Sequence, residues 1–386
     1  MVKRSIKISS ASSFFLFGPR GSGKSTLLKS LSFLKSAVVI NLLRPQTESQ
    51  FRLDPGALEK VANGLNGGWI VIDEIQKIPK LLDSVHYLIE EKKIKFALTG
   101  SSSRKLKRGA SNLLAGRAFQ YKLYPLIEAE LRAQFQLNDV LHWGSLPKLL
   151  VLKNKKDKIL FLQSYVHTYL KEEILIEQLV RNIDPFSLFL PIAAQMNGQL
   201  LNYTNISRDT GVSYKTVETY FQILEETLLG YFLLPYDRSV RKVQKQSPKF
   251  YFIDQGIKRA LANQLHNVLS DKTTEYGDAF ESWFISECVA RNEYFQKGYQ
   301  FFFLRTKDDV EVDLIIRKSN GSEILIEIKS AEVIIDKHLK NLRSLKNDFA
   351  NAKMMCVCRT RVDQKVDMIE IVSWKTAFAL LKLDHF

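Results

Sequence analysis

The stretch from Gly18 to Thr26 reads GPRGSGKST and fits the spacing G-x-x-x-x-G-K-[ST], with Gly18, Gly23, Lys24 and Ser25 in register. The glycines allow backbone N–H groups to point inward around an anion, and the positive end of a following helix strengthens that attraction. Lys24 would contact the β- and γ-phosphates, and the Ser25 hydroxyl would bind Mg²⁺. The stretch therefore predicts an ATP or GTP site. The alternative is a glycine-rich turn that holds no ligand.

The sequences on both sides of this loop have the patterns that the chemistry requires. Phe14 to Phe17 is an apolar run typical of a buried parallel strand, and Leu27, Leu28 and Leu31 recur at helical spacing. The loop is therefore predicted to connect a strand to a helix. The residues expected to bind the nucleotide are Gly18, Pro19, Arg20, Gly21, Ser22, Gly23, Lys24, Ser25 and Thr26.

A second motif begins at Trp69, where an apolar run to Ile72 ends in Asp73 and Glu74. This pattern is typical of a buried parallel strand that carries acidic residues at its carboxyl end. Asp73 is suited to the outer coordination sphere of Mg²⁺, and Glu74 is suited to polarise the water that attacks the nucleotide. The alternative is a polar strand end without a chemical role.

Further strands are expected around these two motifs. Val38 to Leu42 reads as a strand and Pro55 to Ala62 as a helix, so the strands that carry the two motifs need not be neighbours in the sheet. A third apolar strand, Phe96 to Leu98, ends in the polar run Thr99 to Ser103. A hydroxyl there, with Ser101 as the candidate, could contact the γ-phosphate; a serine-rich turn without such a role is the alternative.

Four blocks stand out, namely FLFGPRGSGKST from Phe15, VIDEIQKIP from Val71, LTGSSSRKL from Leu98 and LLAGRAFQYKLYPL from Leu113. They resemble the AAA-type ATPases (AAA+ superfamily) of bacteria and archaea that join a P-loop core to a C-terminal domain of unknown function. The resemblance implies that Arg117 approaches the γ-phosphate, in cis or from a neighbouring subunit, because the rigid charge of arginine stabilises phosphoryl transfer. Arg117 could equally cap a helix or pair with an acid.

Length and composition agree with several domains in a cytoplasmic protein. The chain has 386 residues, 45% of them hydrophobic, which supports two or three domains that each bury a core. No apolar run approaches the length of a membrane helix or of a signal sequence, so we expect no membrane partner. Cys288, Cys356 and Cys358 read as reduced core residues, and the six histidines lack the spacing of a zinc site.

The charge of the chain points to a polyanionic partner. The formal net charge is +15 and the pI is about 9.5, a balance that favours nucleic acid, and DNA is the leading candidate. Two groups of basic residues stand out: Arg104, Lys105, Lys107, Arg108 and Arg117, and then Arg238, Arg241, Lys242, Lys245 and Lys249. The second group is the candidate for contacts with phosphates, although such groups are often only solvated loops.

A helix–turn–helix is predicted between Tyr203 and Glu226. The turn falls at Gly211 to Ser213, Ser213 is placed as an N-cap, and Tyr214 to Thr216 would form the exposed first turn that contacts DNA. The runs 231–234 and 249–253 read as strands, which would make the second basic group the tip of a wing. Winged helices beside ATPase cores also serve as lids or as protein-docking modules, so DNA contact is one of two hypotheses.

The C-terminal part carries a second group of charged residues. Glu281 falls on a predicted helix, Asp313 on the strand 311–316, and Glu327 and Lys329 share one face of the strand that begins at residue 324. Such a cluster could hold Mg²⁺ against a phosphodiester. This order of residues, within FFLRTKDDVEVDLII and ILIEIKS, resembles the restriction-endonuclease-like nucleases. The alternatives are an ordinary ion pair, or a nuclease-like fold that no longer cleaves.

We therefore predict an α/β protein with a P-loop, AAA-like parallel-sheet domain (1–125), a helical linker with a winged helix (126–255) and a restriction-endonuclease-like α/β domain (256–386). ATP and Mg²⁺ are the expected cofactors. The residues expected in catalysis are Lys24, Glu74, Ser101 and Arg117; the expected metal ligands are Ser25 and Asp73, and separately Glu281, Asp313 and Glu327 beside Lys329. ATP hydrolysis would be coupled to DNA binding, with nuclease activity open. The alternative is a nucleotide-gated protein-interaction switch whose nuclease-like fold no longer cleaves. A homo-oligomer or a protein partner is left open.

Overall fold

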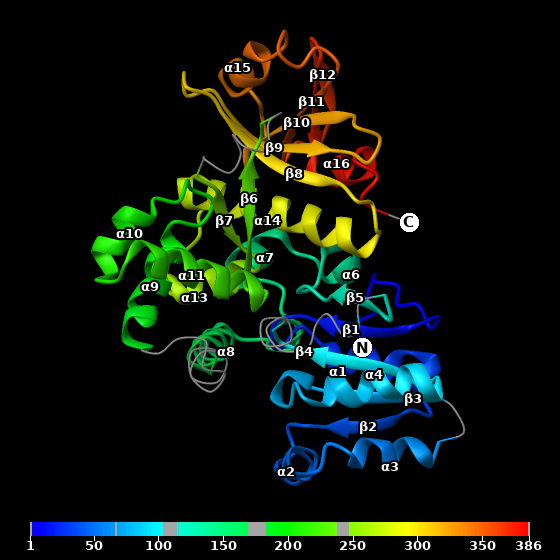
Figure 1. The fold of residues 1–386 in the computed structure, drawn as a ribbon. Coiled ribbons are helices and arrows are strands. Elements are labelled where there is room, and N and C mark those ends of the chain that lie inside the picture. The colour runs from blue at the N-terminus through cyan, green and yellow to red at the C-terminus, as the bar shows by residue number, and fades with distance from the viewer. Residues whose placement is uncertain are drawn as a thin grey trace. The chain divides into compact units, whose positions relative to one another are not determined.

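The computed structural model describes residues 2–65, 68–102, 114, 116–168, 183–237 and 247–384 (Figure 1). The chain forms two compact units. Unit 1 comprises Met1–Leu126, Leu146–Lys148 and Ile223–Leu229, and unit 2 comprises Ile127–Ser145, Leu149–Gln222 and Gly230–Phe386. Each unit contains its own β-sheet, so each has the means to bury its own core.

Unit 1 contains a parallel sheet of five strands in the order β2-β3-β4-β1-β5. The strands are β1 (Ser13–Phe17), β2 (Val38–Asn41), β3 (Trp69–Asp73), β4 (Lys95–Gly100) and β5 (Ala118–Lys122). β4 lies between β1 and β3, so the strands that precede the two predicted motifs are not neighbours. The carboxyl end of β4 consequently lies between the ends of the other two strands.

Helices cover both faces of this sheet. They are α1 (Lys24–Ser30), α2 (Pro45–Leu53), α3 (Ala57–Asn63) and α4 (Leu81–Lys92), with the 3₁₀ helices η1 (Ser32–Leu34) and η2 (Ile75–Lys77). Phe15 and Phe17 pack in one core cluster with residues of α2, α3 and α4, whereas the ring of Phe14 meets that of Phe33 in η1 with their centroids 6.5 Å apart. Burial on both faces explains why the central strands β1, β3 and β4 contain apolar runs without alternation.

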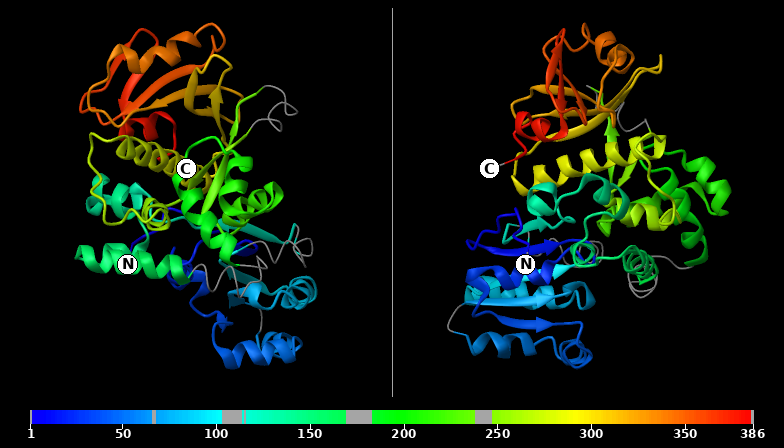
Figure 2. Two further views of the ribbon diagram at one scale, coloured as in Figure 1. Left: turned by 90° about the vertical axis from the view of Figure 1, so that its left-hand side faces the viewer. Right: turned by 180° about the vertical axis from the view of Figure 1, so that it is seen from behind.

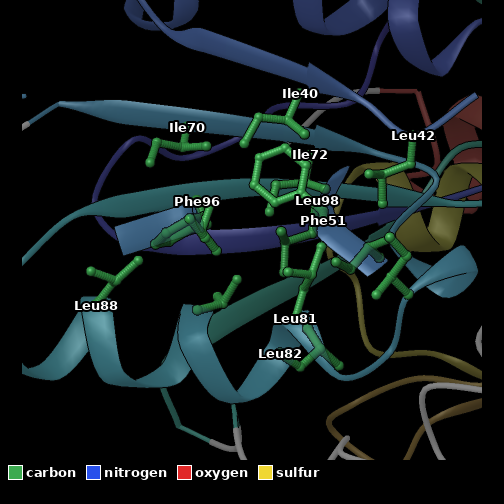
Figure 3. Packing of buried hydrophobic residues seen from close by; sticks show 14 of the residues in the cluster. Ile40, Leu42, Phe51, Ile70, Ile72, Leu81, Leu82, Leu88, Phe96 and Leu98 are labelled. Atoms are coloured by element: carbon green, nitrogen blue, oxygen red, sulfur yellow. The ribbon is translucent and has the colours of Figure 1, made fainter. Parts of the chain in front are cut away.

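The core of unit 1 joins α4 to the strands. Figure 3 shows Leu81, Leu82 and Leu88 of α4 beside Phe96 and Leu98 of β4, and all five side chains are fully buried. Each buried side chain of this size contributes about 1.5–3 kcal/mol to stability through removal of apolar surface from water. This packing makes β3 and β4 rigid supports for the polar residues at their carboxyl ends.

Unit 2 contains a mixed sheet of eight strands in the order β12-β13-β11-β10-β9-β8-β6-β7. The strands are β6 (Gly230–Pro235), β7 (Lys249–Phe252), β8 (Gln300–Arg305), β9 (Glu311–Arg317), β10 (Glu323–Ile328), β11 (Lys353–Cys358), β12 (Gln364–Val366) and β13 (Ile369–Ser373). β6 pairs in parallel with β8 at Leu234 and Pro235, so the hairpin β6–β7 continues the sheet of the C-terminal strands across the predicted boundary at residue 255.

The other helices of the described residues belong largely to unit 2. They are α6 (Glu128–Leu131), η4 (Arg132–Gln134), α7 (Leu137–Trp143), η5 (Pro147–Leu150), α8 (Lys155–Thr168), α9 (Ile183–Gln195), α10 (Tyr203–Thr210), α11 (Tyr214–Glu226), α13 (Gln255–Leu261), α14 (Thr274–Tyr294), α15 (Asp336–Ser344) and α16 (Trp374–Leu380). The long helix α14 lies beside the strands of unit 2 in each view of Figure 2. It packs against α16 through stacked rings of Phe284 and Phe378, whose centroids are 5.1 Å apart.

The predicted pair of helices around Gly211 is present. α10 ends at Thr210, Gly211 adopts a left-handed conformation at φ 68°, and α11 begins at Tyr214. The Ser213 hydroxyl accepts a hydrogen bond from the Thr216 N–H at 3.2 Å, as an N-cap does. Glycine is the residue that adopts this conformation without a steric penalty, which is why the turn could be placed from the sequence.

All three cysteines are buried and free, as predicted for reduced core residues. No helix in the described part of the chain combines the length and the apolar character that crossing a bilayer demands.

We expect Gly256→Ala to destabilise the protein strongly. A Cβ on Gly256 in α13 would lie 1.8 Å from the carbonyl oxygen of Trp143, and a backbone atom cannot move aside as a side-chain end can. Overpacking of this kind costs about 1–3 kcal/mol, and a contact this close should fall at the upper end. Thermal unfolding followed by circular dichroism should show a lower midpoint.

Gly277→Ala is the matched control, because Gly277 also lies in a helix but its Cβ would meet only the Ser330 hydroxyl, at 3.6 Å. Alanine should there leave the midpoint unchanged or raise it, since it is a better helix former than glycine by about 1 kcal/mol. Equal midpoints for the two variants would contradict the packing described for α13.

Candidate nucleotide-binding site

The stretch GPRGSGKST forms a loop between the end of β1 at Phe17 and the start of α1 at Lys24, so the predicted strand–loop–helix arrangement is confirmed. Gly21 and Gly23 have φ values of 72° and 96°, which side chains other than glycine rarely tolerate. The chain approaches closely at Gly18 as well, because a Cβ there would lie 2.5 Å from the carbonyl oxygen of Leu123. The glycines therefore fix the path of the loop.

The loop starts on a rigid base of three strands. Gly18 donates its N–H to the carbonyl of Gly100, which ends β4, at 3.3 Å, and Leu123 just after β5 donates to the carbonyl of Phe17 at 2.7 Å. The carboxyl ends of β4, β1 and β5 therefore meet under the loop. In open α/β sheets this edge is where ligands bind.

Lys24 is buried, with 7% of its surface exposed, and its ammonium lies over the start of the loop. Nζ donates hydrogen bonds to the carbonyl oxygens of Gly18 at 2.7 Å and Pro19 at 3.3 Å. These neutral acceptors hold the ammonium at the site where the loop amides would receive a phosphate. A phosphate oxygen is a stronger acceptor for this donor than a carbonyl, because both partners are then charged.

Ser25 and Asp73 come together although they belong to the two separate motifs. The Ser25 hydroxyl donates to Asp73 Oδ2 at 3.2 Å, and the Thr99 hydroxyl donates to Oδ1 of the same carboxylate. A hydroxyl and a carboxylate supply the oxygen ligands that Mg²⁺ prefers. These residues therefore fit the predicted magnesium ion, with the Ser25 hydroxyl as a direct ligand and Asp73 in its outer coordination sphere.

Glu74 lies beside this pair, in a backbone conformation that costs free energy. Its φ is 62°, a left-handed value unusual for a residue with a side chain, and its N–H donates to the Thr99 hydroxyl at 3.1 Å. The Glu74 carboxylate accepts a hydrogen bond from the amide of Gln76 and a long one, at 3.5 Å, from the Ser101 hydroxyl. The structure therefore brings Glu74 and Ser101 together, whereas the contact predicted for Ser101 was with the γ-phosphate.

Gln76 is a residue of this site that was not predicted from the sequence. It is buried, and its amide donates both to Glu74 and to the Ser101 hydroxyl, the latter at 3.1 Å. A Cβ on Gly100 would lie 2.8 Å from Gln76 Oε1, so the side chain also packs against the end of β4. Its position in the sequence could have indicated this role, because Gln76 follows the predicted base Glu74 by two residues and a polar side chain there can reach the Glu74 carboxylate.

Arg117 does not lie near the P-loop of its own chain. It immediately precedes β5, whose first residue pairs with Ser13 at the amino end of β1. β1 has five residues at about 3.3 Å each, so roughly 16 Å of strand separate this edge from the loop. Arg117 Nε donates to the carboxylate of Glu90 in α4, and this hydrogen bond lowers the pKa of Glu90. The alternative of pairing with an acid is therefore observed, and action on a neighbouring subunit stays a prediction.

Most residues of the two predicted basic groups lie outside the described part of the chain. They are Arg104, Lys105, Lys107, Arg108, Arg238, Arg241, Lys242 and Lys245. Lys249 is described, and the prediction that it contacts phosphates at a wing tip is wrong for this structure. Only 4% of its surface is exposed, and its ammonium pairs with Glu311 Oε1 at 2.5 Å. Alternation within β7 turns Lys249 toward the acidic residues of unit 2 rather than toward solvent.

The predicted cluster in unit 2 assembles from α14, β9 and β10. Lys329 Nζ lies 2.6 Å from Glu327 Oε1 and 3.7 Å from Asp313 Oδ2, and Asp313 also accepts the N–H of Ile328 at 2.7 Å. Burial, reinforced by the charge of Asp313, raises the pKa of Glu281 to about 7. Burial and the same charge also raise the pKa of Glu327, against the opposing effect of Lys329.

Two residues of β7 complete this cluster and were not predicted as part of it. The Tyr251 hydroxyl donates to Glu281 Oε1 at 2.7 Å. Burial lowers the pKa of Lys249, but the carboxylates of Glu281 and Glu311 outweigh burial and leave that pKa above its ordinary value. Within the described ranges, no three His, Cys, Asp or Glu side chains are arranged to hold a metal ion. The metal-binding role of Glu281, Asp313 and Glu327 stays a prediction.

Three parts of the chain match known family models. Residues 10–132 match an AAA domain, residues 134–267 match a domain of unknown function (DUF8612), and residues 276–377 match another domain of unknown function (DUF4143). An uncharacterised protein of Mycobacterium tuberculosis is 27% identical over 318 residues, which are 81% of this chain and 69% of that protein. An uncharacterised protein of Haemophilus influenzae is 24% identical over 331 residues, or 81% of this chain and 78% of that protein.

Two solved structures are distant matches. The ORC1 protein of Aeropyrum pernix in complex with DNA has 13% identity and a TM-score of 0.26 over 66% of this chain and 87% of its own. The McrB AAA+ hexamers of Thermococcus gammatolerans with bound McrC have 10% identity and a TM-score of 0.21 over 50% of this chain and 47% of theirs. TM-scores this low support no argument on fold or function. The match of residues 10–132 to an AAA domain contains the whole parallel sheet of unit 1 and its P-loop.

Proposed function

We propose that the protein binds Mg·ATP at the P-loop of unit 1 and hydrolyses it. The observation that carries this proposal is the hydrogen bond of 3.2 Å between the Ser25 hydroxyl and Asp73. This hydrogen bond joins the end of the loop that would hold the phosphates to Asp73 at the end of β3. The proposed base, Glu74, is the residue that follows Asp73. A glycine-rich turn without a ligand does not require an acid at that place.

Each residue has a task in this mechanism. The loop amides and Lys24 bind the β- and γ-phosphates. Ser25 and Asp73 would hold Mg²⁺, which when bound would neutralise charge on the phosphate oxygens. Glu74 orients a water molecule and accepts its proton as the water oxygen attacks the γ-phosphorus. The bond from that phosphorus to the β–γ bridging oxygen breaks, and ADP and phosphate result. Gln76 and Ser101 hold the Glu74 carboxylate in place through the hydrogen bonds described above.

Release of inorganic phosphate from ATP by the purified full chain tests this proposal. We expect magnesium-dependent release that disappears in Asp73→Ala, because this variant lacks the carboxylate paired with Ser25. Phosphate release that is independent of magnesium, or unchanged in Asp73→Ala, would contradict it.

We further propose that ATP hydrolysis is coupled to DNA, with the α10–α11 pair as a winged-helix contact. The net charge of +15 supports a polyanionic partner, and Tyr214 and Lys215 are exposed in the first turn of α11. Lys215→Ala should weaken DNA binding at low salt and reduce the slope of log K against log salt by about one. A turnover of ATP that is equal with and without DNA would count against this coupling and favour the alternative, a nucleotide-gated switch for a protein partner.

A restriction-endonuclease-like fold in the C-terminal part is supported by the assembly of Asp313, Glu327 and Lys329 at one place in unit 2. Cleavage is tested with a supercoiled plasmid and Mg²⁺ or Mn²⁺. Nicking that is lost in Lys329→Met supports a nuclease, because the variant keeps the length of the side chain without its charge. Absence of nicking in the wild type would leave the cluster as a structural ion pair.

A further inference from the structure

Arg4 connects the N-terminal segment to the P-loop. It precedes β1 and is half-buried, and its guanidinium donates from Nη1 to the carbonyl oxygen of Ser22 at 2.8 Å. From Nη2 it donates to the carbonyl oxygens of Tyr124 at 2.6 Å and Pro125 at 3.4 Å. One arginine thus holds the late part of the loop and the segment that follows β5.

This contact fixes the half of the loop that the strands do not reach. The first half is attached to β4 and β5 through Gly18 and Leu123, as described above. Ser22 has 0% of its surface exposed, and its hydroxyl has no hydrogen-bond partner among the described residues, so its side chain does not fix the second half. Two hydrogen bonds of its backbone do: the Ser22 N–H donates to the Pro19 carbonyl at 3.3 Å, and the Ser22 carbonyl accepts from Arg4 at 2.8 Å.

The orientation of a peptide unit decides where its N–H points. Where an N–H of a P-loop faces a phosphate, the carbonyl oxygen of the same peptide unit faces away from it. A charged donor held on the Ser22 carbonyl keeps that oxygen turned away and the N–H of the next residue, Gly23, turned toward the site. Hydrogen bonds with a charged donor are roughly twice as strong as neutral ones, which suits Arg4 to this task.

We infer that Arg4 is a positioning residue that holds the P-loop in its phosphate-binding conformation before the nucleotide arrives. This inference rests on the proposed function of unit 1. Preorganisation of a loop raises affinity because less conformational entropy is lost on binding. Arginine fits better than lysine, since its planar fork donates to two separate acceptors at once, whereas an ammonium is a single point of charge.

Isothermal titration of the full chain with Mg·ADP, and steady-state hydrolysis of ATP, test the inference. Arg4→Ala should weaken Mg·ADP binding about tenfold and raise the KM for ATP similarly, because charged hydrogen bonds to the loop are lost. kcat at saturating ATP should stay unchanged, since Arg4 contacts neither Glu74 nor the water. Arg4→Lys should give an intermediate Kd. Because it retains the positive charge, this variant also tests the inference if Arg4→Ala does not fold.

Lys3→Ala is the matched control, because it removes an exposed positive charge from the adjacent position. Its Kd should equal that of the wild type. A wild-type Kd in Arg4→Ala or in Arg4→Lys would overturn this inference alone, as would a lower kcat with an unchanged KM. Absence of Mg·ADP binding by the wild type would instead overturn the proposed function and this inference with it.

Discussion

Glu74→Gln is expected to lower the turnover of ATP at least about a hundredfold and to leave the Kd for Mg·ATP close to that of the wild type. Glutamine keeps the size of the side chain and can still accept a hydrogen bond from Gln76 or Ser101. It cannot accept a proton from the attacking water, so the chemical step loses its base while the phosphate contacts of the loop remain. Single-turnover hydrolysis and equilibrium binding of Mg·ATP measure the two quantities separately.

Glu91→Gln is the matched control for this variant, because Glu91 is an exposed carboxylate near the end of α4. It should turn over ATP at the wild-type rate. A Glu74→Gln protein that hydrolyses ATP within about threefold of the wild type would remove Glu74 from the role of general base.

Lys24→Ala should abolish nucleotide binding in the micromolar range and, with it, hydrolysis. In the structure this ammonium already lies on the loop, 2.7 Å from the Gly18 carbonyl, where it needs only to exchange carbonyl acceptors for phosphate oxygens. Loss of contacts with two phosphates at about 1.5–3 kcal/mol each corresponds to a Kd raised by two to four orders of magnitude. Titration with a fluorescent ATP analogue measures the change.

Lys29→Ala tests whether the effect is specific to position 24, because Lys29 is exposed in the last turn of the same helix. Its Kd should equal that of the wild type. Similar losses in the two variants would indicate that net charge, rather than the place of Lys24, governs binding.

The local features of unit 1 could be predicted from the sequence, because each depends on neighbours along the chain. The apolar run before Gly18 formed β1, and the run before Asp73 formed β3. The predicted helix 55–62 is α3, shifted to Ala57–Asn63. The order β2-β3-β4-β1-β5 could not be derived from these runs, since buried parallel strands resemble one another in composition. The contact between Ser25 and Asp73 follows from that order.

The role of Arg117 illustrates a second limit. The resemblance placed it near the γ-phosphate. Its distance from the loop depends on where β5 begins, and β5 begins at the edge of the sheet opposite to the loop. Its partner Glu90 lies in a different helix, and single exposed ion pairs of this kind leave no pattern in the sequence.

The cluster in unit 2 was partly predictable, because two of its residues are close neighbours along the chain. Glu327 and Lys329 share a face because strand side chains alternate, and the ion pair of 2.6 Å agrees with that alternation. Lys249 and Tyr251 could not be assigned to the cluster, because their place depends on the pairing of β6 with β8 far along the chain. The boundaries of the three predicted domains stay predictions.

We propose above that the loop from Gly18 to Thr26 binds a nucleoside triphosphate with magnesium. This binding can be measured by isothermal titration of the purified full chain with a non-hydrolysable ATP analogue, in the presence and absence of Mg²⁺. We expect saturable binding at one site per chain that tightens when Mg²⁺ is added, because Ser25 and Asp73 lie together beside the loop. No detectable binding of the ATP or the GTP analogue with magnesium present would contradict the account.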